Sequence, residues 1–178
     1  MSQPKKRNEI DEKYKWKLEA IYPSEEDWES DYNTVKNLIK DVETKRGTLH
    51  KSAEDFLTTL KLSDELESKT DKLYVYAKMR RDEDNTNNKY QVLFDRAESL
   101  AIEANSALSF VVPEIISIPE DKLTNFLKDN SDLAIYQHYI DEILRQKKHI
   151  LSPEEEKILA MSADVAYASS NIFTMLNN

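Results

Sequence analysis

Apolar residues recur every three or four positions along most of the chain, which is the spacing of an amphipathic helix. The first such stretch begins at Ser24, where a capping residue precedes Glu25, Glu26 and Asp27. Lys45, Arg46 and Gly47 close it, and this order is typical of a basic last turn followed by a C′ glycine. The expected apolar face consists of Trp28, Tyr32, Val35, Leu38, Ile39 and Val42. The pattern predicts a helix with both ends marked.

Two longer helices are predicted next. Ser52 followed by Asp55 repeats the start signal, and apolar positions continue to about Arg81. The polar run 82–88 contains the residues that reverse a chain. The most regular apolar stripe of the sequence comes after it: Tyr90, Leu93, Phe94, Ala97, Leu100, Ala101, Ala104, Ala107 and Leu108. Its small residues would let another helix approach closely, so we expect this third helix to be central.

Shorter elements are predicted beyond the third helix. Pro113 is expected to break or kink the chain, and Pro119 followed by Glu120 opens a short helix to Leu127. Residues 129–131 read as a turn and a cap. Residues 133–159 predict one helix, a corner and a second helix, in which Ser152, Pro153 and Glu155 supply the second N-terminal cap. A last helix carries Val165, Ala168, Ile172, Phe173 and Leu176, and its apolar face is still running at Asn178.

The N-terminal part divides into a tail and an arm. Residues 1–13 are polar and are expected to form a flexible tail. Aromatic and aliphatic residues then crowd together, which predicts an arm that buries them against the bundle: Tyr14, Trp16, Leu18, Ile21 and Tyr22. The expected fold is all-α, a bundle of long antiparallel helices with short connecting helices and this arm. We expect one domain over residues 14–178.

Composition removes several classes of function. Gly47 is the only glycine in 178 residues, so phosphate-binding loops and dinucleotide fingerprints cannot be built. A net charge of −9 argues against a nucleic-acid partner. The absence of cysteine excludes thiolate nucleophiles and fits a reducing compartment. We expect no stretch with the apolar length of a signal peptide or a membrane span, and therefore no membrane partner and a cytoplasmic protein.

The three histidines, His50, His138 and His149, do not have the spacing of a metal site. A zincin helix needs two histidines four residues apart with a glutamate after the first, whereas His138 is followed by Tyr139 and reaches Glu142 at the fourth position. His149 follows two lysines at a helix end, where a cation complements the dipole. We expect structural or surface roles, and no catalytic, cofactor-binding or metal residues in this chain.

Acidic runs and tyrosines have similarly ordinary explanations. Residues 25–27 and 154–156 lie in first turns, where negative charge is favoured, and residues 82–84 read as a solvated turn. Several tyrosines could line a peptide-binding groove, although packing at the edge of the core is the favoured interpretation: Tyr74, Tyr76, Tyr136, Tyr139 and Tyr167. On the residues alone, the chain specifies an acidic helical domain with no recognisable chemistry.

The order of several motifs nevertheless resembles one enzyme family. The chain is similar, from about Tyr14 to Asn178, to the N-terminal region of oligoendopeptidase F, a zinc metallopeptidase of the thimet oligopeptidase clan. One departure is Lys17, where an aspartate is more usual. The motifs are Tyr14 to Ser24 with Trp28, Asp84 to Tyr90, Pro113 to Ile115, and Lys148 to Ser152 with Glu155, Glu156 and Leu159.

The resemblance implies a role without implying a catalytic residue. Members of this family bind zinc through a His-Glu-x-x-His helix and a downstream glutamate in a C-terminal catalytic domain, which this chain lacks. In the complete enzyme the zinc would therefore lie outside this segment, and the segment alone is expected to be inactive. Its helices would wall the channel that admits short peptides to the missing catalytic domain, and the isolated segment is expected to self-associate through the face that this domain would cover.

Two alternatives remain open from the sequence. The chain could be a stand-alone helical scaffold or interaction module without enzymatic activity, because no site is visible and an apolar face could bind a partner. The other alternative is a self-sufficient metalloenzyme that uses His138 and nearby carboxylates, which the histidine spacing disfavours.

Overall fold

The computed structural model describes residues 9–147 and residue 173. The chain divides into two units, the first ending at Gln137 and the second beginning at His138, and each is described by itself. The described residues contain helices and no strand. The predicted all-α fold is therefore confirmed.

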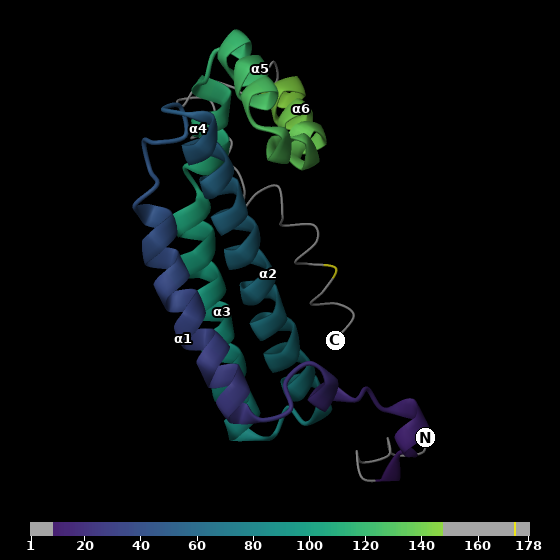
Figure 1. The fold of residues 1–178 in the computed structure, drawn as a ribbon. Coiled ribbons are helices and arrows are strands. Elements are labelled where there is room, and N and C mark those ends of the chain that lie inside the picture. The colour runs from purple at the N-terminus through teal and green to yellow at the C-terminus, as the bar shows by residue number, and fades with distance from the viewer. Residues whose placement is uncertain (1–8, 148–172, 174–178) are drawn as a thin grey trace. The chain divides into compact units, whose positions relative to one another are not determined.

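Three long helices make up the first unit: α1 (Glu25–Glu43), α2 (Ala53–Glu83) and α3 (Asn88–Leu108). Figure 1 shows them side by side, each running antiparallel to the one before it. Each of the three packs against both of the others. The bundle therefore has no single central helix, and the prediction that α3 is central is not supported. Short loops at the two ends join the helices.

The helix starts follow the capping signals. The Ser24 hydroxyl accepts the backbone N–H of Asp27 at 3.2 Å, and the Ser52 hydroxyl accepts that of Asp55 at 3.0 Å. Each bond satisfies a backbone donor that has no partner inside the helix. The Asn87 side chain caps α3 in the same way through the N–H of Lys89. The predicted beginnings of all three helices are confirmed.

The core of the bundle lies where the three apolar faces meet. Trp28 is 1% exposed, and its indole N–H donates to the Leu73 carbonyl at 3.3 Å. The indole can therefore be buried without leaving its polar group unpaired. Fully buried side chains from all three helices continue the core along the bundle: Val35, Val42, Phe56, Leu60, Leu66, Leu73, Ala97 and Leu100.

The end of α1 differs from the prediction. The helix stops at Glu43, and the N–H groups of Lys45 and Arg46 bond three residues back, so the chain tightens into turns before Gly47. Gly47 does take a left-handed φ of +75°. Its N–H donates to a Glu114 carboxylate oxygen at 2.6 Å, so a distant side chain helps to hold this turn.

The proline break also lies elsewhere than predicted. α3 ends at Leu108 and the next helix, α4 (Val111–Ser117), begins ahead of Pro113. Pro113 lies in the first turn of α4, where a missing N–H costs no helical bond. The helix α5 (Glu120–Asp129) follows as predicted. Residues Ser131–Tyr136 then form a 3₁₀ helix, η4, where an α-helix was expected, and the Asn130 side chain caps it by accepting the N–H of Asp132.

The stretch Asn88–Ser117 reaches the length and composition of a membrane-spanning helix, with a mean hydropathy of 1.3 in its most apolar window. The expectation that no segment does so was wrong. The apolar side chains of α3 that face α1 and α2 are part of the bundle core, and core helices pass the same test of length and composition.

The N-terminal arm consists of two short 3₁₀ turns, η2 (Glu12–Tyr14) and η3 (Leu18–Ala20). Leu18 and Tyr22 are buried, as predicted. Tyr14 and Trp16, however, are 72% and 78% exposed, so the prediction that the arm buries all its aromatic residues was wrong. Apolar character alone does not decide burial, because a flanking turn can point a ring toward solvent.

Within the second unit the structure describes part of α6 (Gln137–Gln146), Lys147 and Phe173. Ile140 and Ile143 are buried on one side of α6. The predicted corner with Ser152, Pro153 and Glu155, the cluster 154–156 and most of the predicted last helix lie outside the described residues.

Candidate functional site

Residues 9–147 contain no group of three or more histidine, aspartate or glutamate side chains that could hold a metal ion. His50 is exposed in the loop between α1 and α2. His138 is exposed on α6, in the other unit, and His149 lies outside the described residues. Both described histidines are thus exposed, and the expectation that no catalytic residue lies in this chain stays a prediction.

The most elaborate polar arrangement in the first unit joins the arm to α1 and α2. The Tyr22 hydroxyl donates to an Asp31 carboxylate oxygen at 2.9 Å, and Lys69 and Lys72 of α2 lie 3.1 and 3.5 Å from the same carboxylate. The Lys72 ammonium also lies 4.1 Å from the centre of the Tyr22 ring. One carboxylate therefore holds three segments of the chain together.

The charges of this arrangement shift the pKa values of both acids. Burial raises the pKa of Tyr22, and the neighbouring Asp31 carboxylate raises it further. For Asp31 burial acts upward, but the hydrogen bonds from Tyr22 and Lys69 and the positive charges of both lysines outweigh it and lower the pKa. Asp31 is thus held as a carboxylate and Tyr22 as a neutral phenol.

A second junction centres on Arg80 near the end of α2. Its guanidinium donates to Glu19 of the arm at 2.8 Å, to Glu83 at 3.0 Å and to the Tyr76 hydroxyl at 3.2 Å. Burial acts to lower the pKa of Arg80, but these hydrogen bonds outweigh it, so the guanidinium remains charged. The Glu19 partner lies 61 positions away in the sequence, and no local pattern predicts it.

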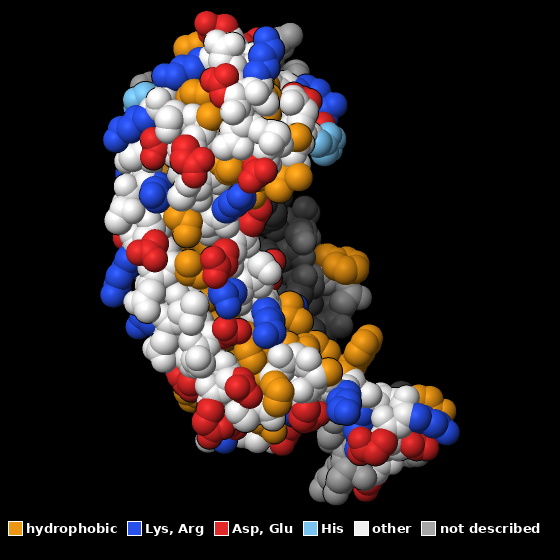
Figure 2. Space-filling model, in the orientation of Figure 1, with side chains coloured by type: hydrophobic (Ala, Val, Ile, Leu, Met, Phe, Trp, Pro, Cys, Tyr) orange, Lys and Arg blue, Asp and Glu red, His pale blue; other side chains and the backbone are white. Residues whose placement is uncertain are grey.

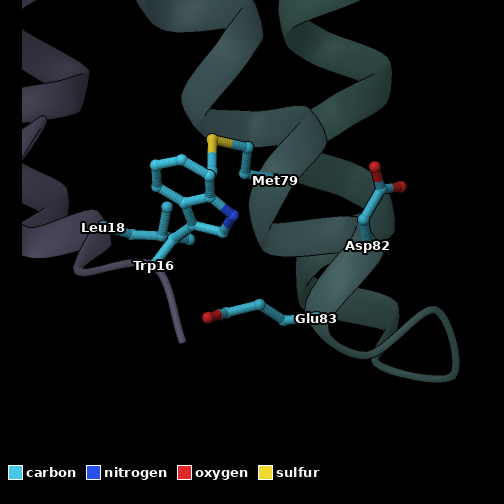
Figure 3. A pocket seen from close by; sticks show the side chains of 5 residues that line it. All are labelled: Trp16, Leu18, Met79, Asp82 and Glu83. Atoms are coloured by element: carbon cyan, nitrogen blue, oxygen red, sulfur yellow. The ribbon is translucent and has the colours of Figure 1, made fainter. Parts of the chain in front are cut away.

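Next to the Arg80 junction, the arm and the end of α2 line a hollow of about 310 Å³. Figure 3 shows the Trp16 indole lying close to Met79, with the Glu83 carboxylate below it and Asp82 farther along α2. The lining combines an apolar wall with an acidic rim. It could bind an apolar group that carries a positive charge, but it contains no nucleophile or paired acid and base for catalysis.

The tyrosines considered for a groove are mostly packing residues. Tyr76 is buried and meets Tyr22 edge to face, and Tyr74 packs against Phe94. Tyr136 is 7% exposed and donates to an Asp64 carboxylate oxygen. For these three the predicted packing role is confirmed. Tyr139 is 43% exposed in the second unit, and Tyr167 lies outside the described residues.

Of the two described acidic runs, one lies where the sequence places it and the other does not. Residues 25–27 occupy the first turn of α1. Glu83 belongs to the last turn of α2 rather than to a free turn, because α2 continues two residues beyond its expected end at Arg81. It pairs with Arg80.

Comparison with known proteins gives a consistent result over nearly the whole length. The chain is 41% identical over 172 residues to an oligopeptidase, PepF, of Bacillus subtilis, and 34% identical over 175 residues to a plasmid-encoded oligoendopeptidase F of Lactococcus lactis. The crystal structure of oligoendopeptidase F from Enterococcus faecium superposes with a TM-score of 0.68 at 33% identity, over 86% of this chain. The chain belongs to the oligoendopeptidase F family.

The match places the chain in one region of that family. The N-terminal family model, described as Oligopeptidase F, matches residues 114–178. The alignments cover 97% and 98% of this chain but only 26% and 29% of the curated relatives' own lengths. The chain therefore corresponds to the N-terminal region of oligoendopeptidase F, which confirms the resemblance of its sequence motifs.

Proposed function

We propose that this chain is the non-catalytic helical portion of a zinc endopeptidase that hydrolyses short peptides. The observation that carries the proposal is its alignment, over nearly its full length, with about a quarter of each curated oligopeptidase. The names of these relatives describe peptidases that act on oligopeptides. We propose cytoplasmic peptide degradation as the setting.

The described residues do not fit a zinc site, because no suitable group of ligands occurs among them. In this proposal another region of the complete enzyme would hold the zinc, which would supply Lewis-acid activation of the scissile carbonyl and of water. No step of that chemistry is assigned to the residues of this chain.

The role proposed for the helices is to wall the substrate channel. Rigid antiparallel helices that pack over a shared core suit this task, because a wall must keep its shape to exclude folded proteins. Figure 2 shows acidic and basic side chains interspersed over the face of the bundle in view. Such a mixed surface would impose only a weak charge preference along most of the wall.

The test uses the complete product of the gene. We expect a protein several times larger than 20.8 kDa that contains a His-Glu-x-x-His motif and retains zinc on dialysis. It should cleave a short unstructured peptide and leave the same sequence uncut when this is displayed on a folded protein. Chelation should abolish the cleavage.

A second experiment tests the wall directly. Single cysteines at exposed Lys36 of α1, Glu65 of α2 and Ile102 of α3 would each carry a bulky maleimide in the complete enzyme. Labels that face the channel should lower kcat/KM more for longer peptides than for dipeptide-sized substrates. Equal effects of the labels at all three positions would contradict the proposal that the helices wall the substrate channel. A gene product that ends at Asn178 without peptidase activity would favour a stand-alone scaffold.

A further inference from the structure

Two of the three seams between the long helices are closed by ion pairs. Asp31 of α1 pairs with Lys69 of α2 at 3.1 Å. Arg96 of α3 forms a bidentate ion pair with Glu29 of α1, in which the Nη2 of Arg96 lies 2.9 Å from the Oε2 of Glu29. Each of these two seams therefore contains at least one pair of opposite charges.

The seam between α2 and α3 is different. Glu67 and Asp71 lie one turn apart on α2, and within the described part of the chain no ion-pair partner is recorded for either. The facing residues of α3 are the uncharged Ala101, Ala104 and Asn105. At this point of the seam two carboxylates lie together, and no cation is recorded beside them among the described residues.

A groove of about 180 Å³ opens at this point of the seam. Its lining residues are Glu67, Thr70, Asp71, Ala101, Ala104, Asn105 and Leu108. The short alanine side chains leave room between the helices, and the two buried members of the lining, Thr70 and Ala104, form its floor. Glu67, Asp71 and Asn105 are exposed, so the groove can be reached from solvent.

The floor contains a hydroxyl without a partner. Thr70 is 7% exposed, and its Oγ1 makes no hydrogen bond within the described structure. Thr59 and Ser63, the other buried hydroxyls of α2, donate to carbonyls four residues back at 2.8 and 2.9 Å. A buried polar group left unpaired costs about 1–3 kcal/mol, so an unpartnered hydroxyl at the floor of a groove indicates a missing ligand.

The electrostatics of the groove agree with a positively charged ligand. Burial raises the pKa of Glu67, and repulsion from Asp64 and Asp71 raises it further. The Asp64 carboxylate accepts a hydrogen bond from the Tyr136 hydroxyl. Neither carboxylate of the groove has a recorded hydroxyl donor among the described residues. A bound cation would relieve the repulsion between them.

We propose that this groove binds the cationic side chain of a lysine or arginine residue in an oligopeptide. Glu67 and Asp71 would accept charge-assisted hydrogen bonds from the ammonium or guanidinium, and the Thr70 hydroxyl and the Asn105 amide oxygen would accept further N–H groups. Two carboxylates are too few for a calcium site, whereas they suit a group that carries several N–H donors. The inference rests on the proposed function, through which peptides reach this surface.

The test measures binding of a model peptide to the whole 178-residue chain. The probe is an alanine-rich hexapeptide with one arginine, and its control carries citrulline, which keeps the shape and removes the charge. Calorimetry should show that the arginine peptide binds at least about tenfold more tightly, the ratio that one charge-assisted hydrogen bond supplies. A lysine peptide should bind in the same groove.

Substitutions in the lining of the groove test whether the arginine peptide binds there. The pair Glu67→Gln with Asp71→Asn should weaken arginine-peptide binding about tenfold or more, while Glu65→Gln, an exposed change on the same helix, should leave it unchanged. Thr70→Val should raise the thermal midpoint of the free chain, because it removes an unpaired hydroxyl, and should weaken binding. Circular dichroism establishes that each variant is folded.

Equal binding of the arginine and citrulline peptides would overturn the proposal, and so would equal effects of Glu65→Gln and the double variant. The outcome is separable from the proposed function. If the complete gene product hydrolyses peptides but the arginine preference is absent, only the groove assignment fails. If the groove binds arginine but the complete product hydrolyses no peptide, the channel-wall function fails.

Discussion

The Tyr22 hydroxyl donates a 2.9 Å hydrogen bond to Asp31, a contact that joins the end of the N-terminal arm to the second turn of α1. Tyr22 is only 1% exposed, and its ring packs edge to face against Tyr76 of α2. Tyr22 thus anchors this end of the arm through both an apolar and a charged contact, in addition to the buried Leu18 and the Glu19–Arg80 pair. The rest of the arm, including Trp16, extends from this anchor.

The first prediction concerns that anchor. Tyr22→Phe keeps the ring and removes the hydrogen bond to a charged acceptor, so it should lower the free energy of unfolding by about 1.5–3 kcal/mol. Urea unfolding followed by circular dichroism measures the change. Tyr74→Phe is the matched control, because Tyr74 packs against Phe94 and no hydroxyl bond is recorded for it. If both variants lose the same stability, the hydrogen bond is not the anchor.

The second prediction concerns acid stability. The folded state lowers the pKa of Asp31, so this carboxylate binds its proton more weakly in the folded chain than in the unfolded one. Its contribution is therefore present above the unfolded pKa of about 3.9 and is lost as the pH falls through the folded value. Asp31→Asn should be less stable than the natural chain at pH 7, and the difference should shrink below about pH 4.

The control for the acid experiment is Asp41→Asn, an exposed change on the same helix with no recorded ion pair among the described residues. Its difference from the natural chain should be small at every pH. A stability gap for Asp31→Asn that stays constant from pH 7 to pH 2 would show that the carboxylate charge plays no part.

The third prediction concerns the turn after α1. Gly47 has a φ of +75°, and a Cβ added there would meet no atom within 4 Å. Gly47→Ala should therefore cost only the strain of the left-handed conformation, about 1–2 kcal/mol. Gly47→Asn should cost less, since asparagine tolerates this region better. Equal losses for both, measured by thermal unfolding, would indicate a steric rather than a conformational cause.

The fourth prediction concerns the exposed end of the arm. Trp16 is 78% exposed, so Trp16→Ser should change the stability by less than about 0.5 kcal/mol. Self-association of the chain stays a prediction, and exposed aromatic residues of this kind favour it. Sedimentation velocity should show association that depends on concentration and decreases in Trp16→Ser but not in Trp16→Phe. A natural chain that is monomeric at every concentration would contradict this.

The starts of the helices could be predicted because their determinants are local. Ser24 and Ser52 each bond a backbone N–H three residues ahead, and such a bond needs nothing beyond one turn of chain. The end of α1 could not be predicted in the same way. It depends partly on Glu114, 67 positions away, which accepts the N–H of Gly47.

The α2/α3 groove was not predicted either. Glu67 and Asp71 look in the sequence like two more solvated carboxylates of an acidic helix, and Thr70 falls in the stretch with the weakest apolar pattern. What the sequence does not show is which residues of α3 face Glu67 and Asp71. The sequence shows small residues at Ala101 and Ala104 and predicts close helix approach, but it does not show which charges lie opposite them.

The sequence by itself determined the helical class, the capped starts of α1 and α2 and the apolar faces, and its motifs indicated the oligoendopeptidase F family. These features depend on the spacing of residues within one or two turns. Only the tertiary structure decided that Arg80 meets Glu19, that Asp31 meets Lys69, and that Glu67 meets no cation among the described residues. The physical reason is that electrostatic pairing depends on distance in space, which local periodicity does not encode.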